Sequence, residues 1–224
     1  EKKDLALVVS LVPAETVGVF TTNVMKAAPV MVSLENLSKN HLCQAIVVNS
    51  GNANCMTGKK GLDAARTMVQ ETARLVGVTP REVLVASTGV IGSELPVQKI
   101  KAALPGLVKQ LSSPHGGGGH AAAQAILTTD KKAKELAVEC TIRGKKVRVG
   151  IMAKGSGMIC PNMATLIVCI TSDINISHNL LKKAVRQSVV KSFNAMSVDG
   201  DMSTNDTVFV MANGLAANPK IVKE

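Results

Sequence analysis

Aromatic side chains are almost absent from this sequence of 224 residues, which contains three Phe, no Trp and no Tyr. A core must therefore be aliphatic, and the hydrophobic fraction of 46% is enough to build a large one. Many nucleic-acid-binding surfaces stack bases on aromatic rings, which this chain can hardly supply. The net charge of +10 then fits a solvated surface or an anionic small-molecule substrate, and we expect no nucleic-acid partner.

Membrane-spanning runs, a signal peptide and Cys-x-x-Cys pairs are also missing. No apolar run approaches the ~20 residues of a membrane helix, and residues 1–4 do not open a signal peptide. The first residue is Glu rather than Met, so we expect the true N-terminus to lie upstream. An odd number of cysteines favours a reducing compartment; they are Cys43, Cys55, Cys140, Cys160 and Cys169. We therefore expect a cytoplasmic protein with no membrane partner.

Patterns for metals and nucleotides are incomplete. The glycine-rich loop from Gly51 to Lys59 has six residues between its glycines where a P-loop has four, and it is followed by Lys60 where a P-loop needs Ser or Thr. A possible calcium loop near the C-terminal end has Thr204 in place of its glycine and Val210 in place of its glutamate. The histidines fit neither zinc spacing nor a Ser-His-Asp triad, and we expect surface positions for them, including His41 and His178. No metal and no cofactor are predicted.

The hydrophobic pattern alternates between strands and helices. Strands are expected at 5–11, 17–20, 45–48, 83–86, 136–142, 146–151, 166–170 and 207–211. Helices are expected at 59–76, 97–111, 121–127 and 177–193, whereas 29–37 is ambiguous. Residues 112–120, with their glycine run, are expected to form an exposed mobile loop. The fold class is therefore α/β, a single domain over 1–224 in which helices cover a mixed sheet.

Residues 154–165 join a glycine-rich loop directly to a hydrophobic strand. A hydroxyl at that boundary can be held firmly while the preceding peptide bond stays accessible. Thr165 could therefore act as a self-cleaving N-terminal nucleophile, because its freed α-amino group titrates near neutrality and serves as the base. Ala164 leaves room for attack on the scissile carbonyl. A structural threonine at a strand edge remains the alternative.

Two further positions could complete such a site. Thr88 supplies a hydroxyl and Gly89 an unobstructed backbone N–H, and both can stabilise an oxyanion. Lys154 could bind a substrate carboxylate or lower the pKa of the amine by like-charge repulsion. These assignments rest on residue types and their order alone.

Five blocks, taken together, resemble the ornithine acetyltransferase family, the bifunctional glutamate N-acetyltransferases of arginine biosynthesis. The blocks occur in order over nearly the whole chain, and the one ending at Thr165 is the most specific. They are Asn-Ser-Gly-Asn-Ala-Asn (49–54), Ser-Thr-Gly-Val-Ile-Gly (87–92), Thr-Thr-Asp (128–130), Lys-Gly-Ser-Gly-Met with Pro-Asn-Met-Ala-Thr (154–158, 161–165), and Val-Asp-Gly-Asp with Ser-Thr-Asn-Asp (198–201, 203–206).

The resemblance implies a self-processing N-terminal-nucleophile fold, in which helices sandwich two stacked β layers. A precursor would cleave itself between Ala164 and Thr165, so that 1–164 is an α chain and 165–224 the start of a β chain. Thr165 would then carry acetyl from N-acetylornithine to glutamate. Acetyl-CoA is a possible co-substrate. Two α and two β chains would form a heterotetramer.

The resemblance also implies roles for individual residues. Thr165 is the nucleophile, and Thr88 and Gly89 stabilise the oxyanion. The substrate-binding residues would be Thr128, Thr129, Lys154 and Thr165. Family members are much longer, so we expect this to be a partial chain whose remaining substrate contacts lie beyond residue 224. An acidic C-terminal part would balance the positive net charge of this chain.

Two other functions stay open. A related N-terminal-nucleophile aminopeptidase would use water instead of glutamate as the acyl acceptor. Alternatively, the chain is an unprocessed, non-catalytic assembly module in which Thr165 is only a strand residue.

Overall fold

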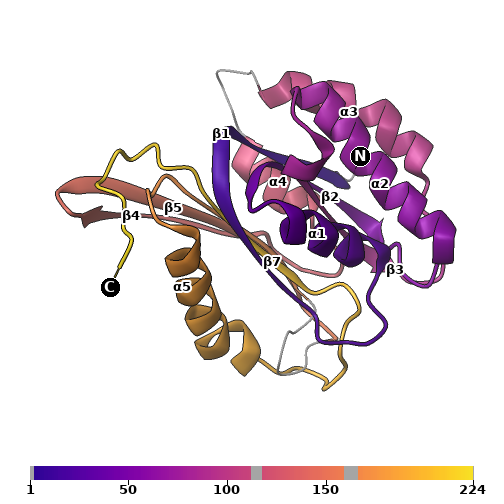
Figure 1. The fold of residues 1–224 in the computed structure, drawn as a ribbon. Coiled ribbons are helices and arrows are strands. Elements are labelled where there is room, and N and C mark those ends of the chain that lie inside the picture. The colour runs from indigo at the N-terminus through magenta and orange to yellow at the C-terminus, as the bar shows by residue number, and fades with distance from the viewer. Residues whose placement is uncertain (1–2, 112–117, 159–165, 224) are drawn as a thin grey trace.

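The computed structural model describes residues 3–111, 118–158 and 166–223. Its strands form one mixed seven-stranded sheet in the order β3-β2-β1-β7-β6-β5-β4 (Figure 1). Two neighbouring pairs, β2–β3 and β6–β7, are parallel, and the other pairs are antiparallel. The strands are β1 (Leu5–Phe20), β2 (Leu42–Asn52), β3 (Val83–Val90), β4 (Lys134–Ile142), β5 (Lys145–Lys154), β6 (Ile167–Ser172) and β7 (Thr207–Ala212).

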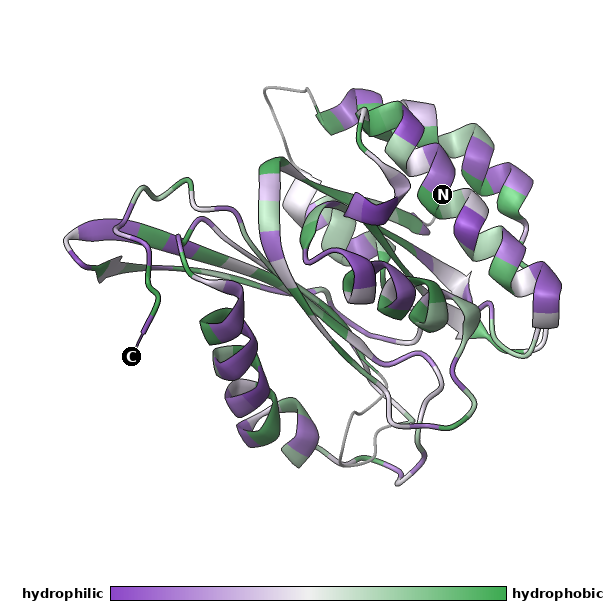
Figure 2. Cartoon of the chain, viewed as in Figure 1, coloured by the Kyte–Doolittle hydropathy of each residue, from purple (hydrophilic) through white to green (hydrophobic). Residues whose placement is uncertain are grey.

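Helices connect the parallel pairs and cover the sheet. They are α1 (Ala28–Lys39), α2 (Gly58–Val76), α3 (Val97–Leu111), α4 (Gly118–Ala125) and α5 (His178–Lys191), with short 3₁₀ turns η1 (Pro80–Glu82) and η2 (Phe193–Ala195). Figure 2 shows hydrophilic and hydrophobic residues alternating along α2, α3 and α5, as expected of helices with one buried side. Among the described helices, none has both the length and the apolarity that crossing a bilayer requires.

Strand β1 differs from the sequence prediction. The prediction placed two strands, 5–11 and 17–20, on either side of a turn at Pro13, but the structure has one strand over Leu5–Phe20. Its register against β2 shifts between Val9 and Ala14. Pro13 lies in this irregularity, where a residue without an N–H disrupts no ladder hydrogen bond. Figure 1 shows that β1 bends sharply, so the turn signal marked a bend within a strand.

The bend divides the sheet into two halves that pack on each other. One core cluster contains Ile46 and Leu84 from β2 and β3 together with Phe209 and Met211 from β7. Outside the first half lie α1, α2 and α3, and outside the second lies α5. The predicted α/β class, with mixed β layers between helices, is therefore confirmed, and a single bent sheet supplies both layers.

Most predicted elements are present, with small shifts at their ends. The ambiguous stretch 29–37 is part of α1, with Pro29 in its first turn, where a missing N–H costs little. Gly118, Gly119 and His120, predicted to lie in a mobile loop, instead begin α4. Ser177 occupies the predicted N-cap position of α5, although its side chain makes no capping hydrogen bond.

Candidate active site

Five of the residues singled out from the sequence line one pocket of about 520 Å³, although they come from three separate segments. They are Thr88, Gly89, Thr128, Thr129 and Lys154. The rest of its wall comes from the ends of β2 and β3, the loops after β2, β3 and β5, and the segment before β7, namely Gly51, Ala53, Val90, Ile91, Ser156, Gly157, Met158, Ser203 and Asn205. The pocket therefore lies where the two halves of the sheet meet.

Gly89 is required by the close approach of β2 and β3. The two strands are parallel, and Gly89 pairs with Gly51 near their carboxyl ends. A Cβ at Gly89 would overlap the Gly51 carbonyl group, and the backbone φ of +134° is one that side chains rarely adopt. This position can therefore offer backbone groups to the pocket but no side chain.

Lys154 and Thr88 form a buried polar pair. The Lys154 Nζ donates a hydrogen bond of 3.0 Å to Thr88 Oγ1, and the two residues are only 4% and 6% exposed. Burial lowers the pKa of Lys154 below its ordinary value, although the charges of Asp130 and Asp206 act in the opposite direction. An ammonium group has only hydrogens to donate, so the hydroxyl hydrogen of Thr88 stays available to another acceptor.

Asp130 holds the segment that follows Lys154. Its Oδ1 accepts a hydrogen bond of 2.9 Å from the Gly155 N–H and also contacts the Lys134 ammonium. Burial opposes ionisation of this carboxyl, but the two hydrogen bonds and the charge of Lys154 bring its pKa below the ordinary value. A fixed negative charge thus stands beside Lys154.

The two threonines of residues 128–129 line the pocket next to the segment that follows Lys154. Thr129 Oγ1 is 2.6 Å from Ser156 Oγ, so the hydroxyl groups link the loop after α4 to the loop after β5. Thr128 lines the pocket beside it. Both positions suit hydrogen bonding to a polar ligand.

Asn205 and Asp206 were not assigned roles from the sequence, although both fall in one of the quoted blocks. The Asn205 side-chain amide donates to the carbonyls of Ala53, at 2.7 Å, and Ser87, at 2.9 Å. It therefore joins the ends of β2 and β3 to the segment before β7. A polar residue next to a strand is a weak signal, because burial of its amide depends on the fold.

Asp206 is fully buried and lies beside the start of β6. Its Oδ1 accepts a hydrogen bond of 3.2 Å from the Leu166 N–H, and its backbone carbonyl accepts one from the Thr21 N–H. Burial raises the pKa of this carboxyl to about 8, although hydrogen bonds and the charge of Lys154 act against the shift. The carboxyl is therefore largely protonated at neutral pH.

Ala164 and Thr165, the predicted cleavage site and nucleophile, lie outside the described residues. The next residue, Leu166, is buried, and β6 begins at Ile167, which pairs with Lys154 at the end of β5. The described part of the chain thus resumes at Leu166, which is bonded directly to Thr165. This point lies beside Lys154 and therefore beside the wall of the pocket.

The pocket contains no cluster of metal-ligating side chains within the described part of the chain. The one such group found among those residues consists of Glu15, His41 and His178, none of which lines the pocket. His41 and His178 had been expected as separate surface histidines, but the fold brings their rings to a centroid distance of 4.5 Å.

Comparisons with known proteins agree with this geometry. The chain is 48% identical to the arginine biosynthesis bifunctional protein ArgJ of Thermotoga neapolitana, over 100% of this chain and 56% of that protein. It is 49% identical to the protein of the same name from Gloeobacter violaceus, over 99% and 54%. The chain therefore spans about half the length of the curated relatives it matches.

Two solved structures resemble the chain. The first is ArgJ of Bacillus halodurans, 41% identical with a TM-score of 0.66, over 72% of this chain and 83% of that chain. The second is an ornithine acetyltransferase of Mycobacterium tuberculosis in complex with ornithine, 34% identical with a TM-score of 0.60, over 70% and 82%. The model of the ArgJ family matches residues 1–224. The chain therefore belongs to the ArgJ family.

Proposed function

We propose that the protein to which this chain belongs is a glutamate N-acetyltransferase that takes acetyl from N-acetylornithine. The observation that carries the proposal is the pocket where Thr88, Gly89 and Lys154 meet, beside the residue bonded to Thr165. The similarity to an ornithine acetyltransferase solved with ornithine supports this substrate class. The protein is assigned to arginine biosynthesis in the cytoplasm.

The first step is self-cleavage between Ala164 and Thr165. The Thr165 hydroxyl oxygen attacks the Ala164 carbonyl carbon, the C–N bond breaks, and the amine takes a proton. Water then hydrolyses the resulting ester, which leaves an Ala164 carboxylate and a free Thr165 hydroxyl and amine.

The second step is acetyl transfer by a two-stage exchange. The Thr165 amine accepts the hydroxyl proton as the oxygen attacks the acetyl carbonyl, and the proton then passes to the departing ornithine amine. The glutamate amine then attacks the acetyl-threonine ester, and the same proton transfers run in the opposite direction, so that acetyl passes to glutamate and the Thr165 hydroxyl is restored. Thr88 and the Gly89 N–H donate to the oxyanion. Because Lys154 donates to Thr88 Oγ1, it directs the Thr88 hydroxyl hydrogen toward the reacting oxygen.

Substrate binding is assigned to the polar walls of the pocket. Thr128, Thr129 and Lys154 would contact the amino acid, and the remaining contacts would come from the part of the protein that the matched relatives have and this chain lacks. Acetyl-CoA is proposed as an additional acetyl donor. After cleavage the α chain would stay with its β chain, two of each forming a heterotetramer.

The decisive experiment combines intact mass with an acceptor assay on the full-length protein. We expect two masses that correspond to cleavage before Thr165, and ornithine release from N-acetylornithine beyond one molecule per active site only when glutamate is present. Sustained release without glutamate would instead identify an aminopeptidase. A single uncleaved mass with no release would identify an assembly module. Replacing N-acetylornithine by acetyl-CoA tests the second donor.

Thr165→Ala is expected to stay uncleaved and to lose activity by about 10⁴-fold or more, because both steps need the hydroxyl. Thr165→Ser is the matched control, since it keeps the hydroxyl and should retain cleavage. Cleavage of the alanine variant at the same bond would contradict the proposed nucleophile.

A further inference from the structure

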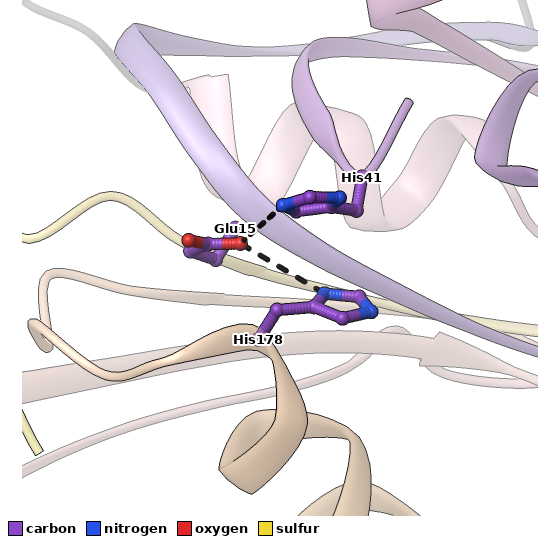
Figure 3. Close-up of side chains that lie close together, drawn as sticks. All are labelled: Glu15, His41 and His178. Atoms are coloured by element: carbon purple, nitrogen blue, oxygen red, sulfur yellow. Dashed lines mark ion pairs between the residues drawn. The ribbon is translucent and has the colours of Figure 1, made fainter. Parts of the chain in front are cut away.

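Three potential metal ligands from distant parts of the chain converge away from the pocket. Glu15 lies on β1, His41 lies between α1 and β2, and His178 is the first residue of α5. Figure 3 shows the two imidazole rings one above the other, with the Glu15 carboxylate beside them and directed toward a nitrogen of each.

The distances suit a shared cation better than direct hydrogen bonds. Glu15 Oε2 lies 3.5 Å from His41 Nε2 and 3.8 Å from His178 Nδ1, whereas an N–H···O hydrogen bond measures about 2.7–3.2 Å. In a tetrahedral zinc site, ligand bonds of about 2.0–2.2 Å place neighbouring ligand atoms about 3.3–3.5 Å apart. The two distances from Glu15 Oε2 therefore lie within a few tenths of an ångström of coordinating ones, and all three ligand atoms lie within 4.8 Å of one another.

Two of the three ligand atoms are buried without a partner. Glu15 Oε2 and His178 Nδ1 have almost no accessible surface and form no hydrogen bond with any residue that the structure describes. A buried polar atom without a partner is costly, so native structures rarely leave one unexplained. A cation between the three groups would satisfy both atoms together.

The backbone holds the three residues in place. Glu15 sits in the middle of the sheet, paired with Leu42 of β2 and Ala212 of β7. The carbonyl of His41 accepts a hydrogen bond of 2.8 Å from the Thr16 N–H, and the residue before His178 donates its N–H to Ile221. The cluster is therefore preorganised, and binding would order little additional chain.

We propose that Glu15, His41 and His178 bind one zinc ion, with water at the fourth position. Two imidazoles and a carboxylate are ligands that suit zinc rather than magnesium or calcium. The His41 side chain is 52% exposed, which leaves a path for the ion and the water. Because no ligand lines the pocket, the ion would be structural and would fasten the start of α5 to β1.

Isothermal titration of the metal-free full-length protein with zinc chloride tests the proposal. We expect the native protein to bind one zinc ion. In His178→Ala and in Glu15→Gln the affinity for zinc should fall by more than about 100-fold, which is the upper range for substitutions that only perturb a ligand. His120→Gln is the matched control, because His120 also contacts a carboxylate, that of Glu135, but is not in a three-ligand group.

Two readouts keep the test independent of folding defects and of the acetyltransferase proposal. Circular dichroism should show that the metal-free variants keep the native secondary structure, and zinc should raise the melting temperature of the native protein and of His120→Gln but not of the ligand variants. Absence of zinc binding, or binding equal in all four proteins, would overturn the proposal and leave an ion-pair cluster of Glu15 with two histidines.

Discussion

Replacing Asp206 with asparagine is expected to stabilise the folded chain, and more strongly as the pH rises. Asp206 is fully buried, its Oδ2 has no hydrogen-bond partner among the described residues, and burial raises its pKa to about 8. In an unfolded chain the same carboxyl ionises near 3.9. Between pH ~4 and pH ~8 the folded state therefore keeps a proton that the unfolded state has lost, and the stability of the folded state falls as the pH rises through this range.

The size of this stabilisation follows from the free energy of protonating the Asp206 carboxyl, which must take up a proton when the chain folds. At pH 7 the pH lies about three units above the pKa of the unfolded carboxyl, so protonating it costs about 4 kcal/mol, whereas at pH 5 the cost is about 1–2 kcal/mol. Asparagine needs no proton and keeps the Oδ1 that accepts from the Leu166 N–H. The protonated carboxyl and the asparagine amide each place a hydrogen-bond donor at a position without a partner in the described part of the chain. The free-energy cost of burying that donor is therefore the same in both proteins and cancels in the comparison.

Urea unfolding of the uncleaved Thr165→Ala protein, with and without Asp206→Asn, measures the effect. The gain in the free energy of unfolding should increase from about 1–2 kcal/mol at pH 5 to about 4 kcal/mol at pH 7. Asp63→Asn, at an exposed position of α2, controls for the loss of a surface carboxylate. A gain that is flat or shrinks with pH would show that Asp206 is ionised in the folded chain and would refute the reasoning.

Two further substitutions test how the pocket is built. Gly89→Ala should destabilise the chain by about 3 kcal/mol or more in urea unfolding, since the new methyl group would overlap the Gly51 carbonyl; native stability would contradict this close approach. Asn205→Ala leaves two buried carbonyls unpaired and should cost about 2–4 kcal/mol by the same measurement. A loss below about 0.5 kcal/mol would mean that Asn205 does not hold the two sheet halves together.

The elements that could be predicted from the sequence are those whose signal is local. Helix α2 carries its apolar residues at helical spacing, and the Arg143-Gly144 turn sets the β4–β5 hairpin, in which Ile142 pairs with Lys145. The bend of β1 could not be predicted, because Pro13 is equally compatible with a turn and with a bulge in a strand. Its outcome depends on the pairing of β1 with both β2 and β7.

The candidate site was predictable only in part, for a related reason. Thr88, Gly89 and Lys154 followed from short blocks and from the family resemblance, and they do share one pocket. The burial of Asp206 depends on contacts with distant residues such as Leu166, 40 positions away, and the approach of His41 to His178 joins residues that are more than a hundred positions apart. The spacing of residues along a single sequence does not reveal which distant residues come into contact.

The bend of β1 explains why the pocket exists at all. In the strand order, Thr88 of β3 and Lys154 of β5 are five strands apart, which in a flat sheet is about 24 Å at 4.7–4.9 Å per strand. Their side chains are nevertheless 3.0 Å apart, and Asn205 before β7 reaches the carbonyl of Ser87 on β3. Only a sheet folded on itself allows both contacts. The irregularity around Pro13 therefore brings the proposed oxyanion donors of one half to the proposed cleavage junction of the other.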